Sequence, residues 1–251
     1  MKISVSNLSF AGFRYKELQA LPAHIGLELF VEFGTEYYWE KVLQELYTDQ
    51  DRQQLSFHAP CLSVNLADPF DTQYLALYES FFRFASAWQP DFIVLHTNED
   101  LAGEPVLLRQ LVEKRLAQLF DMAALYDLRL VIENVGLIAK NNLLYNRNQY
   151  FDLLQKFPQA YALIDTGHAH ANAWNLSELI HELGPRLLGV HLHDNGGQLD
   201  EHLPIGEGTI SWPAVLAAVQ TYAPEANLVL EYDRVDLPVV QNSIAWLEKQ
   251  F

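Results

Sequence analysis

Residue types that bind metal ions or carry protons recur in this chain at the ends of short apolar runs. Histidines end two runs, at His58 and His96, and carboxylates end three others, at Glu133, Asp165 and Glu231. The full set of such residues is His58, His96, Glu133, Asp165, His168, His191, His193, Asp200, His202 and Glu231. Imidazole nitrogens mixed with carboxylate oxygens suit zinc, manganese, iron or cobalt better than calcium. The residue types therefore predict a site for a divalent metal ion.

Each of these residues, taken alone, also has a purely structural interpretation. A histidine at a strand end is more often a hydrogen-bonded structural group than a ligand, and Glu133 or Asp165 could cap the helix that follows it. The structural interpretation is weaker for the whole set, because buried carboxylates are costly unless they are paired or bound to a cation. Many such groups facing one cavity therefore favour a metal site.

The runs that carry these residues have the length and composition of strands buried on both faces. The expected strands are residues 3–6, 25–30, 55–58, 92–96, 129–133, 162–165, 188–193 and 228–232. Segments with helical spacing of apolar residues lie between them, at 39–47, 74–88, 106–126, 150–157, 176–183, 212–222 and 239–247. This alternation predicts a single (β/α)8 TIM barrel, an α/β fold, spanning residues 1–251 as one domain. A doubly wound sheet is the rival fold, but it usually carries a glycine-rich turn after its first strand, which this sequence lacks.

The composition of the chain limits which partners it is expected to bind and in which cellular compartment we expect it. The 251 residues include 16 basic and 32 acidic side chains, for a net charge of −16, which disfavours binding to a nucleic acid. The single cysteine, Cys61, excludes an intrachain disulfide and favours a cytoplasmic location. No motif pairs Cys61 with a base, so we expect no nucleophilic role for it. No apolar run is long enough for a signal peptide or a membrane span, and formation of a homo-oligomer is left open.

At these residues the sequence resembles the xylose-isomerase-like TIM-barrel superfamily, which includes sugar phosphate isomerases, epimerases and endonuclease IV. The resemblance covers nearly the whole chain. Its most specific stretch is His191-Leu192-His193-Asp194-Asn195, continued by Asp200-Glu201-His202-Leu203-Pro204-Ile205-Gly206-Glu207-Gly208. Two shorter motifs support it, Asp165-Thr166-Gly167-His168 and Glu133-Asn134. These motifs are specific for the superfamily and say little about the substrate.

Resemblance to the sugar isomerases and epimerases implies one metal ion. Its ligands would be the residues at Glu133, Asp165, His191 and Glu231. The two glutamates would also exchange protons with the substrate carbon, and His168 would contact the substrate.

Resemblance to endonuclease IV implies three zinc ions instead. All nine of the corresponding ligand positions are present, at His58, His96, Glu133, Asp165, His168, His191, Asp200, His202 and Glu231. Glu133 would bridge two of the ions, and His168, Asp200 and His202 would form the third site.

The chain departs from both subfamilies. Epimerases of this group often carry an arginine shortly after the strand-seven histidine, where this chain has Asn195-Gly196-Gly197-Gln198. Endonuclease IV holds DNA with basic loops, whereas this chain is acidic and the segments that follow its strands look short.

The preferred interpretation is a metal-dependent isomerase or epimerase of carbohydrate metabolism, acting on a small sugar, sugar phosphate or related polyol. Glu133 and Glu231 would move the proton, and a metal-stabilised enediolate would form. One ion of zinc, manganese, cobalt or iron is expected, although the ligands suffice for three. The side chains expected to face the substrate are His168, His193, Asp200 and His202, and His193 could instead orient a metal ligand. Two alternatives stay open: a multi-metal phosphodiesterase acting on a small molecule rather than DNA, and a non-catalytic metal- or sugar-binding barrel.

Overall fold

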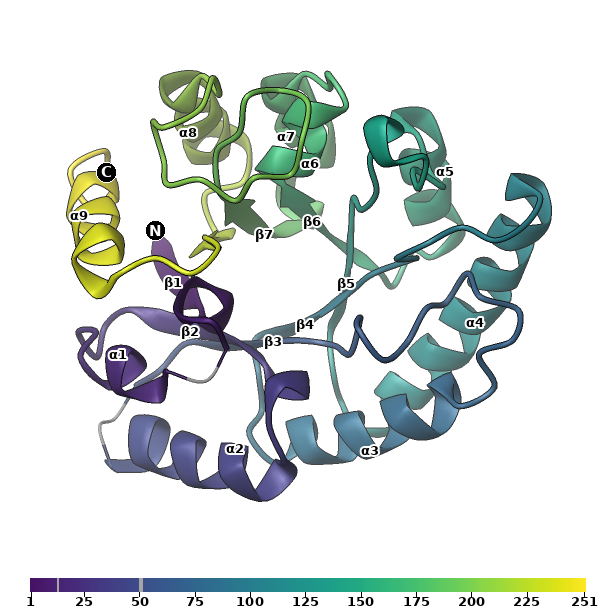
Figure 1. The fold of residues 1–251 in the computed structure, drawn as a ribbon, viewed down its shortest axis with the longest axis horizontal. Coiled ribbons are helices and arrows are strands. Elements are labelled where there is room, and N and C mark those ends of the chain that lie inside the picture. The colour runs from purple at the N-terminus through teal and green to yellow at the C-terminus, as the bar shows by residue number, and fades with distance from the viewer. Residues whose placement is uncertain (13, 50–51) are drawn as a thin grey trace.

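Parallel strands close into a barrel in this protein (Figure 1). The computed structural model describes residues 1–12, 14–49 and 52–251. Within these residues each strand pairs with the next along the chain, and β8 pairs with β1. The strands are β1 (Lys2–Ser6), β2 (Gly26–Phe30), β3 (Leu55–His58), β4 (Phe92–Leu95), β5 (Leu130–Glu133), β6 (Tyr161–Asp165), β7 (Leu187–Leu192) and β8 (Asn227–Leu230). The TIM barrel predicted from the sequence is confirmed.

Helices surround the strands and cover the outer face of the barrel (Figure 1). They are α1 (Tyr15–Gln19), α2 (Glu36–Leu43), α3 (Tyr74–Ser86), α4 (Pro105–Leu125), α5 (Arg147–Lys156), α6 (Thr166–Ala171), α7 (Leu176–Leu183), α8 (Trp212–Tyr222) and α9 (Leu237–Leu247). The sequence did not predict α1 or α6, because five or six residues are too few to show a helical period. None of the described helices is both long enough and apolar enough to cross a lipid bilayer.

The apolar residues inside the barrel set the direction in which the site residues point. Phe92, Val94, Val131 and Leu163 form a buried cluster of their own. A Cβ atom on Gly189 would lie 2.9 Å from Cδ1 of Leu163, so β7 also faces this cluster. Successive side chains of a strand alternate between its two faces. The residues two positions further along these strands therefore face the interior too, and they are His96, Glu133, Asp165 and His191.

The connections that follow the strands correct one expectation from the sequence. They looked short, but the connection from β3 to α3 covers residues 59–73 and that from β7 to α8 covers residues 193–211. The second connection folds back on itself through an antiparallel bridge between Asp194 and Leu203. Long connections at this end of a barrel commonly form the walls of a binding site.

Candidate metal centre

The imidazole of His191 lies among three carboxylates inside the barrel. Its Nδ1 atom is 3.0 Å from Oε2 of Glu231, 3.7 Å from Oε2 of Glu133 and 3.8 Å from Oδ2 of Asp165. Nδ1 of His191 and Oε1 of Glu231 are buried and have no hydrogen-bond partner among the described residues. A ring nitrogen and carboxylate oxygens that converge without a proton donor fit the ligand shell of a divalent cation.

Glu28 determines which nitrogen of His191 faces these carboxylates. Its Oε1 atom lies 2.7 Å from Nε2 of His191, and its Oε2 atom accepts a hydrogen bond of 2.8 Å from Oγ of Ser56. A carboxylate can only accept at this distance, so Nε2 of His191 carries a proton and donates it. Nδ1 then keeps its lone pair for a cation, as in carboxylate–histidine–metal triads.

The Asp165-Thr166-Gly167-His168 motif lies where β6 ends and α6 begins, and its side chains belong to the site. Oδ1 of Asp165 caps α6 by accepting from the backbone N–H of His168 at 2.7 Å, while Nε2 of His193 donates to Oδ2 of Asp165 at 2.8 Å. A Cβ atom on Gly167 would lie 1.9 Å from Cε1 of His193, so only glycine leaves room for that ring. Asp165 can therefore cap α6 through Oδ1 and still direct Oδ2 toward the central group.

Asn134 ties the ends of β5 and β6 together. Its side chain accepts from the backbone N–H of Asp165 at 2.7 Å and donates to the Asp165 carbonyl at 3.2 Å. This two-way hydrogen bond holds the backbone at Glu133 and Asp165 at one spacing, which explains why Asn134 follows Glu133 in the sequence motif.

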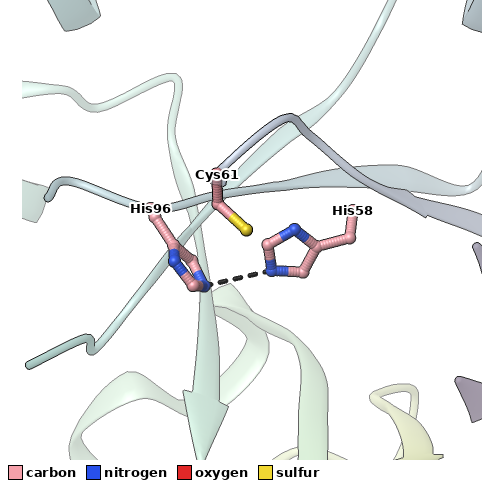
Figure 2. Close-up of side chains that lie close together, drawn as sticks. All are labelled: His58, Cys61 and His96. Atoms are coloured by element: carbon pink, nitrogen blue, oxygen red, sulfur yellow. Dashed lines mark hydrogen bonds between the residues drawn. The ribbon is translucent and has the colours of Figure 1, made fainter. Parts of the chain in front are cut away.

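A second group of ligand atoms, from His58 and His96, lies at the ends of β3 and β4 (Figure 2). Nε2 of His58 is 3.0 Å from Nε2 of His96, and Oε2 of Glu133 lies 3.6 Å from the first and 3.1 Å from the second. Burial disfavours a charged imidazole at His96, but Glu133 and Glu99 outweigh it and raise the pKa of His96 to about 10. A cation between these atoms would take the place of that proton.

A third group joins α6 to the long connection after β7. Oδ2 of Asp200 lies 3.2 Å from Nε2 of His168 and 3.3 Å from Nε2 of His202. Burial disfavours the charged form of His202, yet Asp200 outweighs it and raises the pKa of His202 to about 9. Nδ1 of His168 approaches Oε1 of Glu133 at 3.3 Å and links this group to the first.

Asp194 shapes the connection that carries Asp200 and His202. One of its carboxylate oxygens accepts from the backbone N–H of Ile210 at 3.1 Å, and the other accepts from Nε1 of Trp212 at 2.7 Å. Trp212 is therefore held beside Asp194 in the fold. The Asp194 side chain, fully buried, thus acts as the anchor around which this connection folds.

The three groups border a cavity of about 220 Å³. Its wall includes the sequence-predicted residues His58, His96, Glu133, His168, Asp200, His202 and Glu231, together with Leu8, Phe30, Phe33, Cys61, Leu62 and Lys140. Asp165 and His191 lie beneath this wall, fully buried. A cavity below the range of roughly 300–1,000 Å³ usual for drug-sized ligands suits a small molecule.

His193 does not line this cavity, so of the two roles that the sequence left open, contact with the substrate or orientation of a metal ligand, its position fits the second. It is fully buried, donates to Asp165 and stacks on His202 with ring centroids 3.9 Å apart. His193 follows the last residue of β7, and its ring packs against Gly167 of α6, where the missing side chain leaves room for it. In this structure His193 orients Asp165.

Sequence reasoning missed three residues that contact the predicted ligands. Glu28 was overlooked because it lies inside a strand, although a glutamate in the apolar run Gly26–Phe30 was a usable signal. Glu99 accepts from Nδ1 of His96 at 2.5 Å, and its place three residues after that histidine was a second signal. Cys61 lies near His58 and His96, which no motif indicated.

Comparison with known proteins places the chain in a family. The model of the xylose isomerase-like TIM barrel family matches residues 7–250. The chain belongs to this family. The expectation drawn from the sequence motifs is therefore confirmed at the level of the family.

Solved structures share the fold over most or nearly all of their length. A D-tagatose 3-epimerase-like protein is 22% identical, with a TM-score of 0.83, and the match covers 100% of this chain and 97% of that one. The IOLI protein, solved with a bound zinc atom, is 14% identical, with a TM-score of 0.80 and coverage of 100% and 99%. A D-psicose 3-epimerase from Clostridium cellulolyticum H10, solved with D-tagatose, is 14% identical, with a TM-score of 0.76 and coverage of 98% and 90%.

Matches among curated sequences are partial. The protein MJ1614 of Methanocaldococcus jannaschii is 26% identical over 99 residues, which are 39% of this chain and 38% of that protein. This similarity therefore spans well under half of the relative's length.

Proposed function

We propose that this protein is a divalent-metal-dependent isomerase or epimerase of a small sugar, sugar phosphate or related polyol. The observation that carries the proposal is the convergence of Glu133, Asp165 and Glu231 on the unpartnered Nδ1 atom of His191, below a cavity of about 220 Å³. Sugar epimerases with the same fold, one of them solved with D-tagatose, support this choice of substrate class.

A divalent ion held by these four residues would polarise the substrate carbonyl and neutralise negative charge that develops on its oxygen. The reaction itself requires a base that takes a proton from the carbon beside the carbonyl and an acid that returns one. Glu133 and Glu231 both border the cavity, and Oε1 of Glu231 is not engaged by any described residue. We assign the two proton transfers to these carboxylates.

Electrostatics keep the buried Glu133 ionised, so it is able to accept a proton. Burial disfavours its charged form, but His96 and His191 outweigh that cost and hold the pKa of Glu133 well below its usual range. It therefore enters the reaction ionised. His168, Asp200 and His202 border the same cavity and are assigned to substrate hydroxyl groups, while His193 and Glu28 orient Asp165 and His191.

Hydrolysis of a small phosphodiester is the second candidate, and the group formed by His58, His96 and Glu133 favours it. Their ligand atoms lie 3.0–3.6 Å apart beside the central group, an arrangement that could hold a second ion. Paired metal ions can clamp the attacking and leaving oxygens of a phosphoryl group.

The proposal is tested with a Glu133→Gln variant loaded with zinc or manganese. Turnover of ketose sugars such as D-tagatose should fall by on the order of 10²–10⁴-fold, because a positioned general base contributes about that much. Exchange of the substrate carbon proton with deuterated water, followed by NMR, measures the step directly. Glu207→Gln, a carboxylate on the connection after β7 that does not border the cavity, is the matched control.

Two outcomes would reject the isomerase. One is a Glu133→Gln variant that exchanges the proton at the wild-type rate. The other is a wild-type protein that exchanges no proton in any ketose or ketose phosphate but cleaves a phosphodiester such as bis-p-nitrophenyl phosphate.

A further inference from the structure

We propose that the thiolate of Cys61 completes a second, four-ligand metal site with His58, His96 and Glu133, and that this site selects zinc. The site concerns an ion other than the one assigned to proton transfer, so it holds whether or not the central group epimerises a sugar. Because Cys61 is the chain's single cysteine, every thiol-dependent signal of the protein reports on this site alone.

The ligand atoms have the spacing of a coordination shell. The Sγ atom of Cys61 and the nitrogens of His58 and His96 all lie within 4.8 Å of one another. In Figure 2 the sulfur points toward the gap between the two imidazole rings. Ligands about 2.1 Å from a tetrahedral zinc ion are separated by roughly 3.5 Å. The three pairs among Nε2 of His58, Nε2 of His96 and Oε2 of Glu133 span 3.0–3.6 Å.

The hydrogen bonds of both histidines direct a lone pair at this point. Nδ1 of His58 donates to the Ala59 carbonyl at 2.9 Å, and Nδ1 of His96 donates to Oε1 of Glu99 at 2.5 Å. Once an ion displaces the proton of His96, each ring presents a bare Nε2, and the two Nε2 atoms face each other and Oε2 of Glu133. Three acceptors at these distances repel one another unless a proton or a cation lies among them.

Glu32 fixes the position of the cysteine. Its carboxylate accepts from the backbone N–H of Cys61 at 3.0 Å, of Leu62 at 2.9 Å and of Ser63 at 2.5 Å. These three bonds hold the start of the connection after β3 against the end of β2. The thiol of Cys61 is almost fully buried at the cavity wall, so it can reach the ion without moving the backbone.

The thiolate changes what this second site can do. Two imidazoles, one thiolate and one carboxylate make a closed tetrahedral shell, whereas hydrolytic zinc sites keep a position open for water. A soft sulfur ligand also favours zinc over manganese or magnesium. The site would therefore be structural, holding Glu133 in place for the reaction at the central group, rather than a source of a nucleophilic water.

Cobalt provides a direct test, because a thiolate bound to Co²⁺ gives a charge-transfer band in the near ultraviolet. Metal-free wild-type protein titrated with Co²⁺ should develop this band, and Zn²⁺ should abolish it by displacement. Cys61→Ser should bind cobalt at the central group without the band. Leu62→Ala, on the same Glu32-held segment and at the same cavity wall, should keep it, and so should Asp165→Asn at the central group.

Alkylation of the thiol gives a second readout that needs no variant. Burial raises the pKa of the Cys61 thiol, so the reaction of native wild-type Cys61 with iodoacetamide is followed at alkaline pH; saturating zinc should slow it by about tenfold or more, since the free thiolate is the nucleophile. Cobalt binding without the charge-transfer band in wild type, or an alkylation rate that zinc leaves unchanged, would overturn the proposal. Loss of the band in Cys61→Ser, with the band kept in Leu62→Ala, would support the proposal; both readouts report metal binding and do not depend on the reaction assigned to the central group.

Discussion

Nε2 of His191, on β7, donates a hydrogen bond of 2.7 Å to Oε1 of Glu28, on β2, and both side chains are fully buried. The bond crosses the interior of the barrel and joins strands that are far apart in its order. It sets the tautomer of His191, so that Nδ1 faces the three carboxylates of the central group. Partners of this kind commonly affect metal affinity by about 10–100-fold.

Replacing Glu28 with glutamine should therefore weaken the central site without removing any ligand. The neutral amide is a poorer acceptor than the carboxylate, so Nδ1 of His191 becomes a weaker donor to the cation. We expect zinc affinity to fall by about 10–100-fold and activity to return at high metal concentration. Competition with a chromophoric chelator measures the affinity. Ser56→Ala, which removes only the hydrogen bond to the other oxygen of Glu28, should bind zinc as the wild type does.

The central group could be predicted from the sequence because it depends on local features. Glu133 and Asp165 each end a buried strand, and the strand ends of a parallel barrel meet at one mouth. Glu28 could not be assigned in the same way. Its contact with His191 exists only because the barrel closes and both side chains point inward, and the strand sequence alone does not determine which residue lies opposite.

The other differences between the sequence-based predictions and the structure lie in the connections between strands and helices, not in the strands. Cys61 reaches the histidines because Glu32 holds the backbone after β3, a contact between connections that follow two different strands. His193 lies beneath the cavity because Gly167 leaves space under α6. Such paths depend on side-chain contacts along long connections, for which the sequence carries no periodic signal.

The close contact between Gly167 and the ring of His193 predicts that a larger residue at position 167 lowers the stability of the fold. A methyl group there would overlap the buried ring of His193, which is held by Asp165 and cannot swing into solvent. Gly167→Ala should lower the free energy of unfolding by about 1–3 kcal/mol, as overpacking of a filled interior does, and should weaken zinc binding. Chemical denaturation of the metal-free protein measures the first effect. Gly196→Ala, whose new Cβ meets only the carboxylate of Glu201 at 3.3 Å, should change stability little; an equal loss in both variants would contradict this reasoning.

Binding of zinc should release protons near pH 7.5. With a pKa of about 10, His96 is protonated in the metal-free protein at this pH, and an ion at its Nε2 must displace that proton. The release should shrink as the pH rises past 10, where the ring is already neutral, so apparent affinity increases with pH below that value. Calorimetry in buffers of different ionisation enthalpy counts the protons, and His96→Gln should release about one fewer than wild type.

His202 provides the control for that experiment. Its pKa of about 9 keeps it protonated at pH 7.5, but the isomerase assignment gives it no ion to bind. His202→Gln should therefore release as many protons as wild type. A deficit in this variant would indicate that an ion binds at His202, as the phosphodiesterase requires.

Asp200 separates the two reactions most sharply. Its Oδ2 atom lies between Nε2 of His168 and Nε2 of His202 at the cavity wall, at 3.2 Å and 3.3 Å. In the isomerase it holds a substrate hydroxyl, so Asp200→Ala should raise KM by roughly tenfold or more, the effect of losing a hydrogen bond to a charged group, with a smaller fall in kcat. The number of zinc ions per chain, measured by elemental analysis of dialysed protein, should not change.

In the phosphodiesterase Asp200 instead holds an ion that stabilises the phosphoryl group. A variant that binds one zinc ion fewer than the wild type and loses phosphodiesterase turnover would therefore assign this cavity to hydrolysis.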